Sequence, residues 1–308
     1  MNSTNTGFKV KIGINPISWM NDDLPSLGGE TPLETALAEG AEIGYLGFEL
    51  GNKFPKESGA LLAVLGKYKL ACVSGWYSGR LAQRSVDDEI AAVEPHLRLL
   101  AESGATVMVY GEVADAIQGE ALALYKRPRF TSAAQWQDYA DKLGALARHT
   151  LAHGVRLSYH HHMGAYVETE DDVDRLMALT GPEVGLLFDS GHITFAGGDA
   201  LAVLRKHIAR VSHVHCKDVR PAVVKLARNG NWSFLQSVMN GAFSVPGDGC
   251  IDFKAILQAL DQHGYQGWLV VEAEQDPAVA PSYRYAQMGY RYLAQLVAEI
   301  EQSRRVAA

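Results

Sequence analysis

Three short apolar runs decide the fold: VRLSYH at residues 155–160, VGLLFD at 184–189 and VSHVHCK at 211–217. Each run has the length and composition of a buried β-strand, and the residues between them, about 171–179 and 201–209, have the apolar spacing of helices. Strands that alternate with helices pair in parallel through right-handed crossovers. This stretch therefore predicts consecutive strand–helix units in one parallel sheet.

The same alternation covers the rest of the chain. We expect further strands at residues 11–18, 45–50, 70–77, 106–110 and 268–272. Further helices are expected at about 32–40, 59–68, 85–103, 133–153, 253–262 and 283–302, with Ser85 as one cap and Thr131 or Ser132 as another. Eight such units in 308 residues predict an α/β fold, a single (β/α)₈ TIM barrel over residues 1–308. A doubly wound open sheet is the alternative, but no Gly-rich dinucleotide turn follows the first strand.

One connection is longer than a strand-to-helix link requires. It spans about 219–251, after the seventh strand, and contains the turn signals NGN at 229–231 and PGDG at 246–249. The loops that follow barrel strands lie at the end where active sites are built. We therefore expect this insertion to be a loop with some helical content that acts as a lid.

Composition narrows the class of protein. The chain is 47% hydrophobic and carries a net charge of −7, so we expect a folded protein with no nucleic-acid or membrane partner. Its first residues are polar and no segment approaches the ~20 apolar residues of a membrane helix, which predicts a cytoplasmic location. We also expect a homo-oligomer. Cys72, Cys216 and Cys250 lack the spacing of a disulfide framework or a structural zinc site and are predicted to be ordinary thiols.

Reactive side chains gather where the last four strands end. The strand ends read YHHHMG at 159–164, FDSGH at 188–192, HVHCKD at 213–218 and VEAEQD at 271–276. Because side chains alternate along a strand, residues two apart share a side. The side-sharing groups are His160 with His162, His213 with His215 and Lys217, and Glu272 with Glu274.

One inward residue from each of these strand ends can surround a single ion. The predicted metal ligands are His160, Asp189, His215 and Glu272. Two imidazoles and two carboxylates suit manganese, cobalt or iron(II), with zinc also possible. Three substitutions within this set stay open: His162 for His160, His213 for His215 and Glu274 for Glu272. Each residue also has a structural explanation on its own, and Asp189 before Ser190-Gly191 can simply cap a turn.

With these residues placed, the chain resembles the xylose isomerase-like family of metal-dependent barrels, the sugar isomerases and epimerases. That family holds one divalent ion with a Glu, an Asp, a His and a Glu from strands five to eight. Asp189, His215 and Glu272 match the last three, whereas His160 stands where the first Glu is expected. His192, three residues beyond the Asp, matches a substrate-binding His of several members.

A narrower resemblance is to the inosose dehydratases of myo-inositol catabolism. The motifs that carry it are GINPISWMNDD at 13–23, GFELGNKFP at 47–55, SGWY at 74–77 and the strand ends YHHHMG, FDSGH and VEAEQDP. The resemblance implies a hydro-lyase that removes water from 2-keto-myo-inositol (scyllo-inosose), a small polyhydroxylated cyclic ketone, to give 3D-(3,5/4)-trihydroxycyclohexane-1,2-dione. It implies Mn²⁺ or Co²⁺ as the metal, and glutathione as a possible cofactor for which the sequence shows no site.

Dehydration needs one base for the proton next to the carbonyl and one acid for the departing hydroxyl. The candidates for these two roles are Lys217, Glu272, His162 and His192, and those for substrate contacts are Asn15, Glu49, Trp76, His192 and Arg220. An epimerase of this barrel uses two opposed carboxylates, so His160 in place of one favours a dehydratase. The alternative function is a sugar or inosose isomerase or epimerase. A nuclease or a non-catalytic sugar-binding protein fits the acidic balance and the intact ligand set less well.

Overall fold

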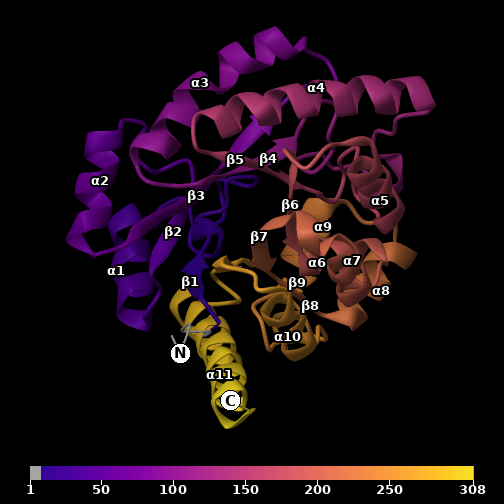
Figure 1. Cartoon of the computed structure of the whole chain (residues 1–308). Coiled ribbons are helices and arrows are strands. Elements are labelled where there is room, and N and C mark those ends of the chain that lie inside the picture. Colours follow the sequence, from indigo (N-terminus) through magenta and orange to yellow (C-terminus); the bar gives the residue numbers. More distant parts are fainter. Residues whose placement is uncertain (1–7, 308) are drawn as a thin grey trace.

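Parallel strands form a closed barrel at the centre of the molecule (Figure 1). The computed structural model describes residues 8–307. Its barrel strands are β1 (Val10–Ile14), β2 (Gly47–Leu50), β3 (Ala71–Gly79), β4 (Val107–Glu112), β5 (Arg156–His160), β6 (Gly185–Asp189), β7 (Val211–Cys216) and β10 (Gly267–Val271). The barrel closes because β1 pairs in parallel with both β10 and β2. The predicted TIM barrel is confirmed.

Helices on the outside shield the strands from water (Figure 1). They are α1 (Leu33–Ile43), α2 (Ser58–Lys67), α3 (Val86–Glu102), α4 (Ala133–Ala152), α5 (Glu170–Leu179), α7 (Ala200–His207), α10 (Phe253–His263) and α11 (Ser282–Ala307). The predicted cap Ser85 accepts a hydrogen bond from the Asp88 backbone N–H. At α4 the cap is Ser132, which forms a capping box with Gln135.

Two local expectations were wrong. The first strand was expected to run to Ser18, but β1 ends at Ile14 and a 3₁₀ helix covers Pro16–Ser18, because Pro16 has no N–H to continue a ladder. A short helix, α6 (Ser190–Ala196), was not expected after β6. Its sequence, SGHITFA, has weak helix propensity, and the Asp189 carboxylate caps it by accepting from the His192 backbone N–H at 2.8 Å.

The long insertion has the helical content expected of it, together with two short strands. It contains β8 (Asp218–Val219), α8 (Pro221–Asn229), α9 (Phe234–Met239) and β9 (Phe243–Ser244), and β8 pairs antiparallel with β9. Its apolar side chains, including Val224, Phe234 and Phe243, form a small core together with Met163 and Phe195 from outside the insertion. Figure 1 shows this unit on the side of the barrel where β6, β7 and α6 lie, and β8 contacts α6.

Two further observations concern the described part of the chain. Between residues 8 and 307, the helices all fall short of the length or apolarity that a membrane crossing requires. Cys72 and Cys216 are buried, Cys250 is exposed, and all three carry free thiols, as predicted.

Candidate metal centre

Four strand ends bring the predicted ligand set together. His160 ends β5, Asp189 ends β6, His215 lies near the end of β7, and Glu272 follows β10 directly. One ligand atom from each lies within 4.8 Å of the others, and each residue is at most 5% exposed. The register explains the choice between neighbouring residues, because Asp189 pairs with His215 across β6 and β7.

The Asp189 carboxylate divides its two oxygens between structure and site. Oδ1 caps α6, whereas Oδ2 lies 3.4 Å from His160 Nε2 and 3.5 Å from His215 Nδ1. The same Nδ1 of His215 contacts Oε2 of Glu272. The turn-capping explanation for Asp189 is therefore correct for one oxygen only, and the other oxygen faces the two imidazoles.

The charges in this group are set by burial and by neighbours. Burial lowers the pKa of His160, which leaves a neutral imidazole at neutral pH. Burial alone would raise the pKa of Glu272, but the charges of His215 and Lys217 outweigh it and bring the pKa to about 2. Burial is likewise outweighed at Asp189 by Lys217 and His192, and its pKa falls well below the usual range. Burial is outweighed at His215 too, because Glu272 and Glu49 raise the pKa of its imidazole well above the usual range. Two ionised carboxylates and the neutral His160 are therefore in the form that a divalent cation requires, whereas His215 would release its proton when such a cation binds.

The donor set fits such an ion. Two imidazoles and two carboxylates converge, all buried, and two negative charges in that environment call for a positive partner. A mixed nitrogen and oxygen set of this kind suits first-row divalent metals rather than Ca²⁺, which prefers oxygen ligands alone.

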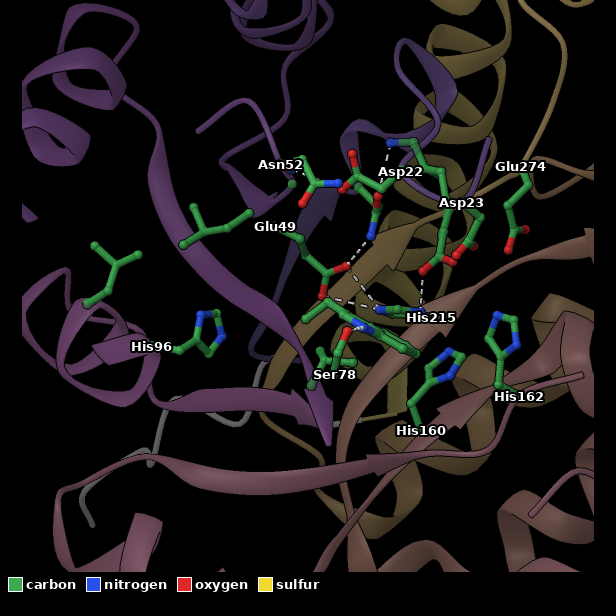
Figure 2. Close-up of a pocket in the computed structure, with 18 of the residues that line it drawn as sticks. Asp22, Asp23, Glu49, Asn52, Ser78, His96, His160, His162, His215 and Glu274 are labelled. Carbon is green, nitrogen blue, oxygen red and sulfur yellow. Dashed lines mark hydrogen bonds and ion pairs between the residues drawn. The ribbon is translucent and has the colours of Figure 1, made fainter. Parts of the chain in front are cut away.

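Glu49 holds the far side of His215. Its carboxylate lies 3.1 Å from His215 Nε2 and 2.7 Å from His213 Nε2, and it accepts hydrogen bonds from Asn15 Nδ2 at 2.8 Å and Ser74 Oγ at 2.6 Å. Figure 2 shows Glu49 and His215 joined in this way. A carboxylate behind a ligating imidazole orients the ring and raises its basicity. Glu49 also lines the cavity described below, so its expected contact with substrate stays a prediction.

A cavity opens over the group (Figure 2). His160, His162, His215, Glu272 and Glu274 line it together with the expected substrate contacts Asn15, Glu49 and Trp76. The indole of Trp76 stands edge-on to His160 and His162, with ring centroids 5.5 and 5.9 Å apart. This wall therefore combines a large aromatic side chain with many polar groups, as sites for small polar ligands do.

Besides the proposed ligand Asp189, three predicted site residues do not line the cavity. Arg220 donates to the Gly241 carbonyl at 2.9 Å and to Ser244 Oγ at 3.1 Å, and so braces the insertion. Lys217 and His192 are buried behind the wall, where the Lys217 ammonium lies 2.9 Å from His192 Nε2. Of the four candidate acids and bases, only His162 and Glu272 face the cavity.

The cavity also has wall residues that sequence reasoning did not assign. Asp22, Asp23, Asn52, Lys56 and His96 line it, and Figure 2 shows both aspartates at its rim. Burial raises the pKa of the Asp23 carboxyl. The motif NDD at 21–23 was quoted only for its resemblance. Asp22 and Asp23 lie in a loop, where no sequence periodicity indicates which way a side chain points. Their position at the cavity could therefore not be predicted from the sequence.

Comparison with known proteins agrees with this architecture. Residues 37–296 match the family described as xylose isomerase-like TIM barrel. The rhizopine catabolism protein MocC of Rhizobium meliloti is 50% identical over 96% of this chain and 90% of its own length. The inosose dehydratase of Geobacillus thermodenitrificans is 45% identical over 92% of this chain and 96% of its own length.

Among solved structures, the fold resembles that of the probable 3-DHS dehydratase AsbF of Bacillus anthracis. The TM-score is 0.69 at 14% identity, with 92% of this chain and 99% of the other covered. The fold and site thus define a TIM barrel with a buried group of metal-ligating residues at its mouth. The chain belongs to the xylose isomerase-like TIM barrel family and, within it, to the branch that contains the inosose dehydratases.

Proposed function

We propose that this protein is an inosose dehydratase, a carbon–oxygen hydro-lyase that converts scyllo-inosose to 3D-(3,5/4)-trihydroxycyclohexane-1,2-dione. The observation that carries the proposal is the buried set of His160, Asp189, His215 and Glu272 beneath a polar cavity. Relatives named inosose dehydratase, 41% to 45% identical over at least 92% of the chain, support the same activity.

We propose one Mn²⁺ or Co²⁺ ion for this set, because mixed imidazole and carboxylate ligands suit both metals. When bound, the ion supplies Lewis acidity toward the substrate's ketone and hydroxyl oxygens. The protein's part is to orient the ring and to move two protons. Trp76, Asp23 and Asn52 line the cavity, and we propose that the indole packs on the ring carbons while the two polar side chains bind ring hydroxyls.

The proton next to the carbonyl needs a base on the cavity wall. His162 Nδ1 donates to the Met163 carbonyl at 2.9 Å, which leaves Nε2 without a proton. Burial lowers the pKa of His162 to about 3, so the ring is neutral at neutral pH and Nε2 has a free lone pair, although burial also makes it a weaker base. We assign the base role to His162. Glu272 is a weaker candidate, because its carboxylate belongs to the proposed ligand set.

The departing hydroxyl needs an acid. Glu274 lines the cavity, and burial, opposed by Lys217, raises its pKa to about 7, so it holds a proton for part of the time at neutral pH. As the proton moves to His162, the carbon–oxygen bond breaks and the hydroxyl leaves as water with the Glu274 proton. His162 and Glu274 lie within 4.8 Å of each other, so the proton can return from the imidazolium to the carboxylate after turnover.

An assay with purified protein tests the function. Incubation with Mn²⁺ and scyllo-inosose is expected to produce the absorbance of a conjugated dione, and chelation is expected to abolish it. An isomerase or epimerase of the same barrel would consume the ketone and yield an isomer without that absorbance. Ketone turnover without dione formation would therefore contradict the proposal.

A second candidate rests on the relative that is 50% identical, the rhizopine catabolism protein MocC. The chain would then act in rhizopine breakdown rather than in general inositol catabolism. Parallel assays on rhizopine and on inosose separate the two candidates, since a dehydratase of inositol catabolism should form dione from inosose and leave rhizopine unchanged.

A further inference from the structure

The Lys217 ammonium lies in a cage of anionic and imidazole groups. Nζ is 2.8 Å from Glu272 Oε1, 2.8 Å from Glu274 Oε2 and 2.9 Å from His192 Nε2, with Asp189 Oδ2 at 3.7 Å. The side chain is 0% exposed and does not line the cavity. An ammonium in this position has no access to substrate, so its role concerns the groups around it.

The cage is built from metal-ligating side chains. His192 and Glu274 also form, with His162, a second buried group whose ligand atoms lie within 4.8 Å of one another, and of these three His192 and Glu274 contact the ammonium. Asp189 and Glu272 belong to the proposed ligand set and also face the ammonium. Neighbouring cation positions that share carboxylates are the arrangement of two-metal sites.

We propose that the Lys217 ammonium is a built-in second cation of this centre, filling the position formed by His192, Glu272 and Glu274 so that the enzyme holds one divalent ion instead of two. The inference rests on the proposed function only for the first ion. Removal of the lysine head should convert the position into a second metal site.

The charge count supports this assignment. Asp189, Glu272 and Glu274 are almost fully buried, and together they carry three negative charges when Glu274 is ionised. One divalent ion and one ammonium supply three positive charges, whereas the ion alone then leaves a buried carboxylate without compensation. In that protonation state the proposed position is favoured by charge as well as by geometry.

The lysine stem is held in place by the surrounding chain. A Cβ at position 191 would lie 2.5 Å from Lys217 Cγ, so only glycine leaves room for the stem against the start of α6. On another side the ammonium lies 5.0 Å from the centroid of the Phe243 ring. Gly191 in the motif FDSGH thereby acquires a function that neither ligation nor helix capping explains.

In this position Lys217 acts as a positioning residue. It binds Oε1 of Glu272, whose other oxygen contacts His215, and Oε2 of Glu274, which lines the cavity. One ammonium thus sets the orientation of a proposed metal ligand and of the proposed acid. A fixed cation also cannot be lost or exchanged when metal is scarce.

Metal counting tests the proposal. Lys217→Ala, purified in excess Mn²⁺ and desalted, is expected to hold two Mn²⁺ ions per chain by elemental analysis, against one for the unaltered protein. Electron paramagnetic resonance should show two coupled Mn²⁺ ions in the variant and an isolated ion otherwise. The double variant Lys217→Ala with Glu274→Gln should return to one ion. As a matched control, Lys206→Ala removes an exposed, ion-paired lysine and should leave the count at one.

If Lys217→Ala does not fold, Lys217→Val, which keeps a short apolar stem beside Gly191 and leaves the position of the ammonium open, is measured in the same way. A folded variant that binds one ion overturns the proposal, as does a second ion that persists after Glu274→Gln. Failure of both variants to fold in excess Mn²⁺ also contradicts it, because the ion should replace the lost charge. Dione formation by the unaltered protein is measured separately, so failure of the proposed function remains distinguishable.

Discussion

At the residue scale, the centre depends on carboxylates that perform two tasks at once. Asp189 caps α6 with Oδ1 and faces the two imidazoles with Oδ2. Glu49 joins His215 to the deeper His213 and to two neutral donors. At Asp189 and Glu49, a substitution that removes only the negative charge can therefore be compared with one that also removes the structural contact.

Asp189→Asn keeps a capping oxygen but removes the charge. We expect metal affinity to fall by more than about 100-fold and dione formation to cease. Residues that only support a ligand typically cost about 10- to 100-fold in metal affinity when they are replaced. Asp189→Ala should lose the cap as well, at a further cost of about 1 kcal/mol in unfolding free energy. Calorimetric titration with Mn²⁺ and chemical denaturation measure the two effects. Full metal occupancy with normal turnover in Asp189→Asn would refute the ligand assignment.

Glu49→Gln tests the support of His215. The neutral amide keeps the volume but polarises the imidazole less, so we expect metal affinity to fall by about 10- to 100-fold with the fold intact. Ser74→Ala, which removes one donor to the same carboxylate, is the control and should have a smaller effect. Metal affinity is read by titration against a competing chelator. Equal affinities for Glu49→Gln and the unaltered protein would show that Glu49 serves the barrel interior alone.

At the element scale, the insertion after β7 is tied down at both ends and packed over the site. The Asp218 carboxylate accepts backbone N–H groups of Val219, Gly247, Cys250 and Ile251 at 2.9 to 3.1 Å. Phe234 and Phe243 are fully buried, and their rings lie 5.0 Å from His162 and 5.3 Å from His192. We therefore propose that the insertion serves as a packed wall behind these histidines instead of the mobile lid expected from its length.

Phe234→Ala tests the wall. Loss of a buried phenyl group should lower the unfolding free energy by about 3 to 5 kcal/mol. It should also lower kcat, because the His162 ring loses its support, while metal content stays unchanged. Met239→Ala on the same helix removes a side chain that is 43% exposed, and should change stability by no more than about 0.5 kcal/mol. Denaturation curves measure the change in unfolding free energy, and steady-state kinetics measure kcat. An unaltered kcat in folded Phe234→Ala protein would show that the insertion has a purely structural role.

At the scale of the whole molecule, the barrel holds four strand ends in one place, and the site joins residues more than 100 positions apart. Any cation that binds there connects β5, β6, β7 and β10 and therefore stabilises the closed barrel. The N-terminal strand completes the closure, because Ile14 of β1 pairs with Val271 of β10. Metal binding and global stability should consequently be linked.

Addition of Mn²⁺ to chelated protein should raise the thermal unfolding midpoint. An ion that binds only the folded state at 100 times its Kd stabilises that state by about 2.7 kcal/mol. Differential scanning calorimetry measures the shift, and Asp189→Asn should show almost none. A midpoint that does not respond to Mn²⁺ in the unaltered protein would mean that the buried group forms no divalent site.

The sequence by itself determined the barrel, the strand ends that carry the chemistry and the side on which each reactive residue lies. These properties follow from local periodicity, since apolar runs mark strands and alternation assigns every second residue to the interior. The broad ligand chemistry was predictable for the same reason. Alternation repeats every two residues, however, so it left His160 or His162, His213 or His215, and Glu272 or Glu274 undecided.

Only the tertiary structure decided depth along the barrel. Depth depends on how far each strand is staggered against its neighbour, and that stagger is a property of the closed sheet. The pairing of Asp189 with His215, beside a register shift between Leu186 and Leu187, places His215 at the ligand level and leaves His213 below with Glu49. Closure of the barrel also buries Lys217 behind the cavity wall and places Asp23 at the cavity. Neither position could be predicted from the sequence, because neither is set within a single strand.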